Sequence, residues 1–252
     1  MKLINSVRTK IAPQKTYHDY SIDKLEHYQC VLGTRLLVVG ANTGVDCKRF
    51  IDRGAQEVHG LDVIEDVGSE YAHPRVTYHR QSIESCNLPS DYFDIAFAVA
   101  TFEHVPDIYA GWSEMARVTK PRGTIFSVAS PLWQSRYGHH MGCFDRHPWI
   151  HLAFDRSGIE EYCVKHDING ERGHSLAAIL DYMLNPSFFN QRPASDYLAA
   201  TQWLRKVEMH ENTFARDDSR LLEHPLAALA MERGYLPDNM LAVTHTLVAT
   251  RQ

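Results

Sequence analysis

Two features of this 252-residue sequence have residue types and spacing suited to ligand binding. One is a glycine turn at Gly40–Gly44, and the other is Asp62, which ends the apolar run after it. A glycine turn lets the backbone approach a ligand closely. A carboxylate at the end of the next strand can accept hydrogen bonds from both hydroxyls of a ribose. Together they favour a nucleoside-containing ligand over a turn that binds nothing.

A third feature is a set of histidines that could transfer protons. His139 and His140 lie in a segment rich in histidine and tryptophan, and His104 lies upstream beside an acid. Imidazole titrates near neutral pH, so any of the three is a candidate catalytic base that takes the proton of a substrate hydroxyl. The alternative is a lid in which the histidines pack with Trp133 and Trp149.

A metal site is another interpretation of the same segment. Imidazole and carboxylate groups both bind divalent metals. The side chains available are His139, His140, Asp145, His147 and His151. Their spacing matches no standard zinc signature and no C-x-x-C pair accompanies them. We therefore expect no metal.

Alternating strand and helix patterns position these residues in the first half of the chain. Short apolar runs with helical patterns between them predict parallel strands joined by crossovers. The predicted strands are Arg35–Val39, Glu57–Asp62, Arg75–His79, Phe93–Ala100 and Thr124–Ala129, and the predicted helices are Asp46–Arg53 and Trp112–Val118. In such a sheet the ligand lies at the carboxyl ends of the strands, so the residues after each strand are the candidates.

The second half has more helical patterns and fewer strands. Helices are predicted at Ser157–Lys165, Ser175–Leu184, Ala194–Trp203 and Leu221–Arg233, and strands at Val207–Phe214 and Leu241–Thr250. No linker-like composition borders any part of it. We expect one domain over 1–252, with an insertion at about 132–205 that covers one end of the sheet.

Composition narrows the class of protein. The formal charge of −5 argues against nucleic-acid binding, which needs a cationic face. No run of apolar residues is long enough to span a membrane, and Met1–Lys10 lacks the apolar core of a signal peptide. The five cysteines form no C-x-x-C pair, which favours reduced thiols in the cytoplasm.

The order of these motifs resembles the class I S-adenosylmethionine-dependent methyltransferases of the small-molecule type. The resemblance covers Leu36–Ser130 and lies in LLVVGANTG, GLD, FDIAFAVATFEHVPD and EMARVTKPRGTIFSVASP. It implies an α/β fold with a doubly wound, Rossmann-like, mostly parallel seven-stranded sheet and a helical lid insertion after strand five. Leu241–Thr250 would be the antiparallel last strand.

The resemblance also implies where S-adenosylmethionine would bind. The methionine part would contact the first turn and the residues after the fourth strand, the ribose would contact the acid, and the adenine would lie after the third strand. The implied cofactor-binding residues are Gly40, Ala41, Asn42, Gly44, Asp62, Ser82, Ile83, Ala100 and Thr101.

Two positions depart from the family pattern. Val38 stands where an acid is usual, and Asn42 stands where a glycine is usual. Asparagine can still adopt the left-handed conformation that glycine would supply.

The sequence thus predicts a cytoplasmic enzyme that transfers a methyl group from S-adenosylmethionine to oxygen of a small-molecule or sugar-containing acceptor. We expect no nucleic-acid partner and no membrane span. One alternative is an NAD(P)-dependent oxidoreductase on a similar sheet, which should show a fuller G-x-G-x-x-G motif than this chain has. The other is a catalytically inactive, methyltransferase-like partner protein, which Val38 and Asn42 suggest.

Overall fold

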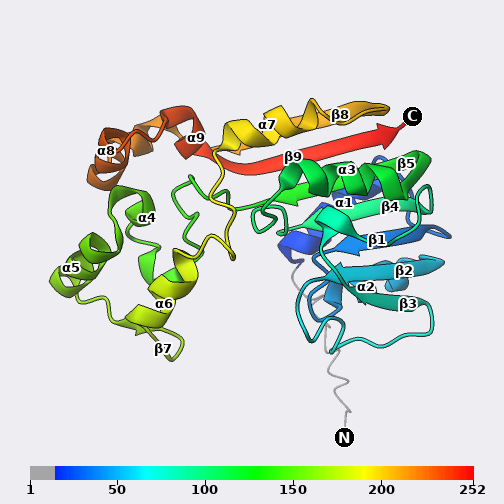
Figure 1. Ribbon diagram of the computed structural model, residues 1–252, viewed down its shortest axis with the longest axis horizontal. Coiled ribbons are helices and arrows are strands. Elements are labelled where there is room, and N and C mark those ends of the chain that lie inside the picture. Colours follow the sequence, from blue (N-terminus) through cyan, green and yellow to red (C-terminus); the bar gives the residue numbers. More distant parts are fainter. Residues whose placement is uncertain (1–14) are drawn as a thin grey trace, which may run out of the picture.

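The protein is described by a computed structural model over residues 15–252. The expectation about a signal peptide in Met1–Lys10 lies outside these residues. Figure 1 shows one sheet with helices on both faces and a further group of helices beyond one end of the strands. No helix within 15–252 is long and apolar enough to cross a bilayer.

The sheet has seven strands in the order β3-β2-β1-β4-β5-β9-β8. β1 to β5 pair in parallel, and β9 runs antiparallel to both β5 and β8. The doubly wound, mostly parallel sheet is therefore confirmed. The strand bounds are β1 Arg35–Val39, β2 Glu57–Asp62, β3 Val76–Arg80, β4 Phe93–Val99, β5 Thr119–Ala129, β8 Val207–Arg216 and β9 Ala242–Arg251.

Helices cover both faces of the sheet because its central strands are apolar on both sides. α1 (Tyr17–Glu26) and α2 (Val45–Asp52) pack on one face, and α3 (Ile108–Val118) and α7 (Ala194–Thr201) pack on the other. β1 alternates between the two cores, with Leu37 in one and neighbouring residues in the other. The strand order reverses between β1 and β4, which creates a crevice at their carboxyl ends.

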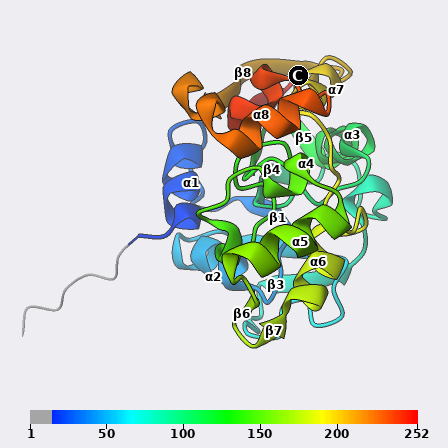
Figure 2. The ribbon, with the colours of Figure 1, turned by 90° about the vertical axis from the view of Figure 1, so that its left-hand side faces the viewer.

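A separate helical part, here called the cap, lies beyond the carboxyl ends of the parallel strands (Figure 2). It consists of residues 132–189 and 219–241, which share a third hydrophobic core around Trp149 and Leu180. Its elements are η2 Gly142–Phe144, α4 Ile150–Ala153, α5 Arg156–His166, β6 Gly170–Glu171, β7 His174–Ser175, α6 Leu176–Met183, η3 Ser219–Glu223, α8 Pro225–Glu232 and α9 Pro237–Leu241.

The cap differs from the predicted insertion at 132–205 in its boundaries. α7 falls within that range but belongs to the sheet, because Tyr197 is buried in the same core as Trp112 of α3. α8 lies outside that range but joins the cap, because Leu226 packs in the cap core. Apolar surface, rather than chain order, decides which helix covers which core.

Some predicted element boundaries were wrong for identifiable reasons. The predicted helix Leu221–Arg233 is divided into η3 and α8, because Pro225 lacks an amide hydrogen and begins a new helix. β5 starts at Thr119 instead of Thr124, with an irregular register before Ile95 of β4. α1 was not predicted, although Thr16 caps it through hydrogen bonds with Asp19.

Candidate active site

A cavity of about 630 Å³ lies at the carboxyl ends of β1 to β4, between the sheet and the cap. The cap contributes Tyr182, Ser187 and Phe188 to it. Ligands of doubly wound sheets bind at this point, where the strand order reverses. Of the predicted cofactor residues, Gly40, Asn42, Asp62, Ser82, Ile83, Ala100 and Thr101 line the cavity.

The turn after β1 has a backbone that only certain residues tolerate. Gly40 has a φ of +73°, and a Cβ there would lie 2.1 Å from Oγ1 of Thr101. Asn42 has a φ of 46°, the left-handed conformation that the sequence predicted for it. Its Oδ1 accepts a hydrogen bond from the amide of Thr43 at 2.8 Å. The turn therefore presents its backbone to the cavity at Gly40 and Asn42.

Ala41 and Gly44 shape this turn without lining the cavity. Ala41 is buried and faces Gly60 of β2. Gly44 precedes α2 with a φ of +101°, and a Cβ there would lie 2.3 Å from the hydroxyl of Tyr78. Both residues support the turn, and neither is among those that line the cavity.

Asp62 holds the first turn and the turn after β2 together. Its carboxylate accepts hydrogen bonds from the amides of Asn42 at 2.9 Å and Val63 at 2.7 Å. Both bonds fix the carboxylate at the edge of the cavity. Val38, where relatives of this type usually have an acid, is buried in the core of the sheet, so it contributes no charge to the turn.

The turn after β3 forms the short helix η1 (Ile83–Ser85). Ser82 caps this helix, and its hydroxyl donates to Oε2 of Glu84 at 2.7 Å. The other carboxylate oxygen of Glu84 accepts from the amide of Asp107 at 2.6 Å. Glu84 and Gln81 also line the cavity. The predicted cofactor residues of this turn were Ser82 and Ile83 alone, although the place of Gln81 and Glu84 directly after a predicted strand was a signal for both.

His104 and His140 lie close to each other at the cap end of the site. Burial lowers the pKa of both imidazoles, and that of His140 falls to about 4. Nδ1 of His104 is 2.5 Å from the carbonyl of Phe188, and Nδ1 of His140 is 2.7 Å from the carbonyl of Gly138. His104 lines the cavity. His104 therefore faces the cavity, and His140 lies beside His104 without lining it.

His139 is in a different environment. Its side chain is fully buried, packs edge-on against Phe144 and His151, and does not line the cavity. Burial lowers its pKa to about 2, so it stays neutral. Its position in the cap core favours the packing role that the sequence analysis gave as the alternative to a base.

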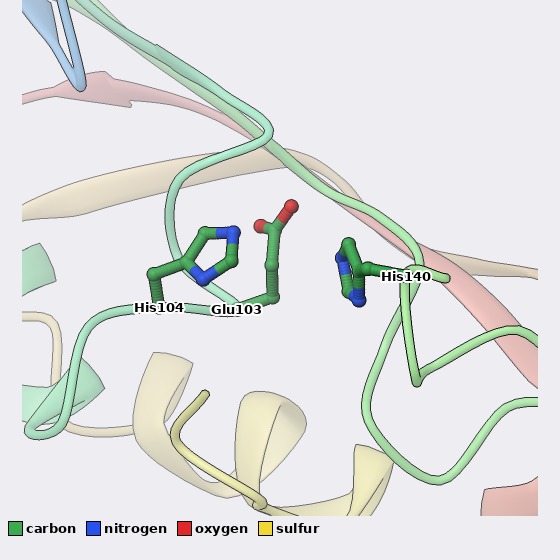
Figure 3. Close-up of side chains that lie close together, drawn as sticks. All are labelled: Glu103, His104 and His140. Carbon is green, nitrogen blue, oxygen red and sulfur yellow. The ribbon is translucent and has the colours of Figure 1, made fainter. Parts of the chain in front are cut away.

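Glu103 lies beside the cavity and was not among the predicted catalytic bases. Its side chain is only 2% exposed, and burial raises its pKa to about 8. Figure 3 shows its carboxyl group between the rings of His104 and His140. We call these three residues the Glu103 group. Within residues 15–252 it is the one cluster of possible metal ligands that converges, so the set of His139, His140, Asp145, His147 and His151 does not form a site.

Residues 37–127 match a family model described as a methyltransferase domain. These residues are therefore similar to a methyltransferase domain, and the chain has the class I methyltransferase fold. The matched residues run from β1 to β5 and include the turns that line the cavity. The match supports a methyltransferase over the oxidoreductase that was the alternative.

A curated methyltransferase is similar in sequence to part of this chain. The ubiquinone biosynthesis O-methyltransferase of Bradyrhizobium sp. (strain ORS 278) is 33% identical over 113 residues, which are 42% of this chain and 44% of that protein. The chain thus aligns with less than half the length of this curated relative.

Two solved structures show how far the fold extends. An S-adenosylmethionine dependent methyltransferase from Mesorhizobium loti is 17% identical, with a TM-score of 0.55 over 91% of this chain and 96% of that one. The cyclase SpnF is 15% identical, with a TM-score of 0.55 over 93% of this chain and 80% of that one. Because a cyclase has this fold too, the fold alone does not determine the reaction, which depends on the residues of the site.

Proposed function

We propose that this chain transfers a methyl group from S-adenosylmethionine to a hydroxyl oxygen of a small-molecule or sugar-containing acceptor. The observation that carries the proposal is the shared cavity, which has the predicted cofactor residues on one side and the Glu103 group beside the other. The methyltransferase family match and the O-methyltransferase relatives support the same reaction.

The residues on the sheet side fit the cofactor. A volume of about 630 Å³ lies within the range of about 300–1,000 Å³ found for small-molecule sites. The carboxylate of Asp62 would accept from the ribose hydroxyls, the apolar side chain of Ile83 would contact the adenine, and the open backbone at Gly40 would admit the methionine part. When bound, S-adenosylmethionine supplies an electrophilic methyl group on a sulfonium sulfur.

The cap side fits the acceptor. Tyr182 and Phe188 line the cavity from the cap, and over a bound acceptor they would help to exclude water from the reacting atoms. As the acceptor oxygen bonds to the methyl carbon, the carbon–sulfur bond breaks, its electron pair stays on sulfur and the hydroxyl proton must leave. The Glu103 group offers two unprotonated imidazole nitrogens, which can either take that proton or bind a cation that promotes its loss.

The other expectations about partners belong to the same proposal. The five cysteines at positions 30, 47, 86, 143 and 163 form no disulfide, which supports the reducing cytoplasm as the compartment. A small-molecule or glycan-type acceptor, and no nucleic acid, fits a net charge of −5.

Calorimetric titration of the purified chain with S-adenosylmethionine, and with NADH for comparison, tests the cofactor. We expect binding of S-adenosylmethionine alone. Formation of S-adenosylhomocysteine with simple phenols and sugars as acceptors then tests the transfer. If neither S-adenosylmethionine nor NADH binds, the chain is an inactive relative. If NADH alone binds, it is the oxidoreductase.

A further inference from the structure

Three potential ligand atoms of the Glu103 group converge from two distant parts of the chain. Glu103 and His104 follow β4, whereas His140 comes from the cap segment before η2. One nitrogen or oxygen atom from each residue lies within 4.8 Å of the other two. In Figure 3 the carboxyl group lies between the two rings.

The two imidazoles are oriented so that a lone pair is available on each. A carbonyl oxygen can only accept a hydrogen bond, so Nδ1 of His104 donates to Phe188 and Nδ1 of His140 donates to Gly138. The hydrogen of each neutral ring is therefore on Nδ1, and Nε2 carries the lone pair. A backbone carbonyl that accepts from the other ring nitrogen is the usual outer partner of a metal-binding histidine.

Two atoms of the group are buried without a partner. Oε2 of Glu103 and Nε2 of His140 have no hydrogen bond among the described residues. The Glu103 side chain is almost completely buried. Buried polar atoms are nearly always hydrogen-bonded, so two unpartnered atoms within one such cluster indicate a missing binding partner.

We propose that Glu103, His104 and His140 bind a divalent transition-metal ion such as Zn²⁺. Two nitrogens and one carboxylate oxygen suit Zn²⁺ or Fe²⁺, whereas Mg²⁺ and Ca²⁺ prefer sites made of oxygen alone. Two nitrogens on one Zn²⁺ lie at most about 4 Å apart, so the side chains would close slightly around the ion. The site differs in its ligands from the histidine set considered in the sequence analysis, where no metal was expected.

The proposal rests on the proposed function and adds to it. Three protein ligands leave a position on the ion for a further oxygen, as in catalytic zinc sites. His104 lines the cavity, so that position would be open to the acceptor hydroxyl. A cation there would favour loss of the hydroxyl proton to solvent, and the imidazoles would act as ligands instead of bases.

The test uses the full chain, stripped with a chelator and titrated with Co²⁺, a Zn²⁺ substitute with a visible spectrum. We expect one equivalent to bind, with absorption bands of a four- or five-coordinate ion, and Zn²⁺ but not Mg²⁺ to displace it. Glu103→Gln and His140→Gln should each weaken binding at least about 10-fold, the lower limit seen even for outer-shell changes.

His147→Gln is the matched control. This cap histidine lies near Tyr162 and His166, outside the Glu103 group, and should bind Co²⁺ like the wild type. No stoichiometric Co²⁺ binding by the wild type would overturn the proposal. Loss of binding in His147→Gln with retention in Glu103→Gln would also overturn it.

Titration of the same samples with S-adenosylmethionine separates this proposal from the proposed function. Co²⁺ binding without S-adenosylmethionine binding would contradict the methyltransferase and leave the metal site standing. Methyl transfer by the metal-free chain at the rate of the loaded chain would contradict the role of the ion in the loss of the hydroxyl proton and leave the methyltransferase standing. Circular dichroism checks that each variant is folded.

Discussion

The polar side chains on the two sides of the cavity differ in their hydrogen bonding. On the sheet side, formed by the turns after β1, β2 and β3, the carboxylate of Asp62 accepts from three backbone amides and Ser82 is bonded to Glu84. The Glu103 group instead leaves Oε2 of Glu103 and Nε2 of His140 buried and unbonded.

This difference in hydrogen bonding reflects how each side is held in place. The sheet side is held by bonds among its own turns, so a change there should affect both folding and ligand binding. The Glu103 group is held by the elements around it, the cap and the chain after β4. Its own polar atoms favour water or a ligand over burial. Substitutions can test this contrast.

The largest effect is expected for Asp62→Ala on the sheet side. The change removes three charge-assisted hydrogen bonds within the turns and the proposed acceptor of the ribose hydroxyls. A hydrogen bond to a charged group is worth about 1.5–3 kcal/mol. Losing those from the two ribose hydroxyls should lower the affinity for S-adenosylmethionine on the order of 100-fold or more. Calorimetric titration measures this.

Glu65→Ala is the control for Asp62→Ala. Glu65 lies in the same turn after β2, but its side chain is 86% exposed and pairs only with Arg80 at the surface. It should bind S-adenosylmethionine like the wild type. An unchanged affinity in Asp62→Ala would show that the sheet side does not bind the ribose.

Gly40→Ala should lower the free energy of unfolding by about 2–5 kcal/mol. A left-handed alanine costs about 1–2 kcal/mol. The new Cβ would also lie 2.1 Å from Oγ1 of Thr101, and overpacking adds about 1–3 kcal/mol. Urea unfolding measures the loss, and a second change, Thr101→Ala, should restore part of it.

Gly234→Ala separates strain from collision. Gly234 also has a left-handed φ, +95°, but a Cβ there would meet no atom within 4 Å. This variant should lose only the conformational part, about 1–2 kcal/mol. Equal losses in the two variants would mean that the contact between Gly40 and Thr101 does not constrain the turn.

A loss of stability in acid is expected to involve both the cap and the sheet. Burial lowers the pKa of His151 in the cap to about 4 and that of His245 in β9 to about 3. Their unfolded pKa is about 6.5. Below pH 6.5 the unfolded state binds protons that the folded state does not, so stability is complete above this pH and falls as pH decreases toward 4.

Each of these two histidines should contribute about 1.4 kcal/mol per pH unit to that fall. Urea unfolding between pH 7 and pH 5 measures the slope. His151→Gln and His245→Gln should each reduce it by about one proton. If only the cap variant changed the slope, acid sensitivity would be confined to the cap side of the molecule.

The sequence was sufficient for the sheet side because the information there is local. Apolar runs mark the buried strands, and the residue after a parallel strand always lies at the same edge of the sheet. Asp62 and Ser82 therefore line the cavity as expected. Ala41 and Gly44 could not be told apart from Gly40 in this way, since the direction of each residue in the turn depends on contacts with Gly60 and Tyr78.

The cap could not be predicted to the same extent. Helical patterns located α5 and α6, but the pattern does not say which core a helix covers. α8 follows β8 in the chain but packs in the cap core, whereas α7 packs against the sheet. The sequence also could not predict which of His139 and His140 lies near the cavity. One adjacent ring packs into the cap core and the other faces Glu103.

The sequence by itself determined the doubly wound sheet, the glycine turn, the position of Asp62 and the family, because strand periodicity and turn chemistry act over a few residues. Only the tertiary structure decided that His140 meets Glu103 and His104. That contact joins the end of β4 to the cap, and it depends on how two separate hydrophobic cores pack against each other. No local pattern encodes such packing.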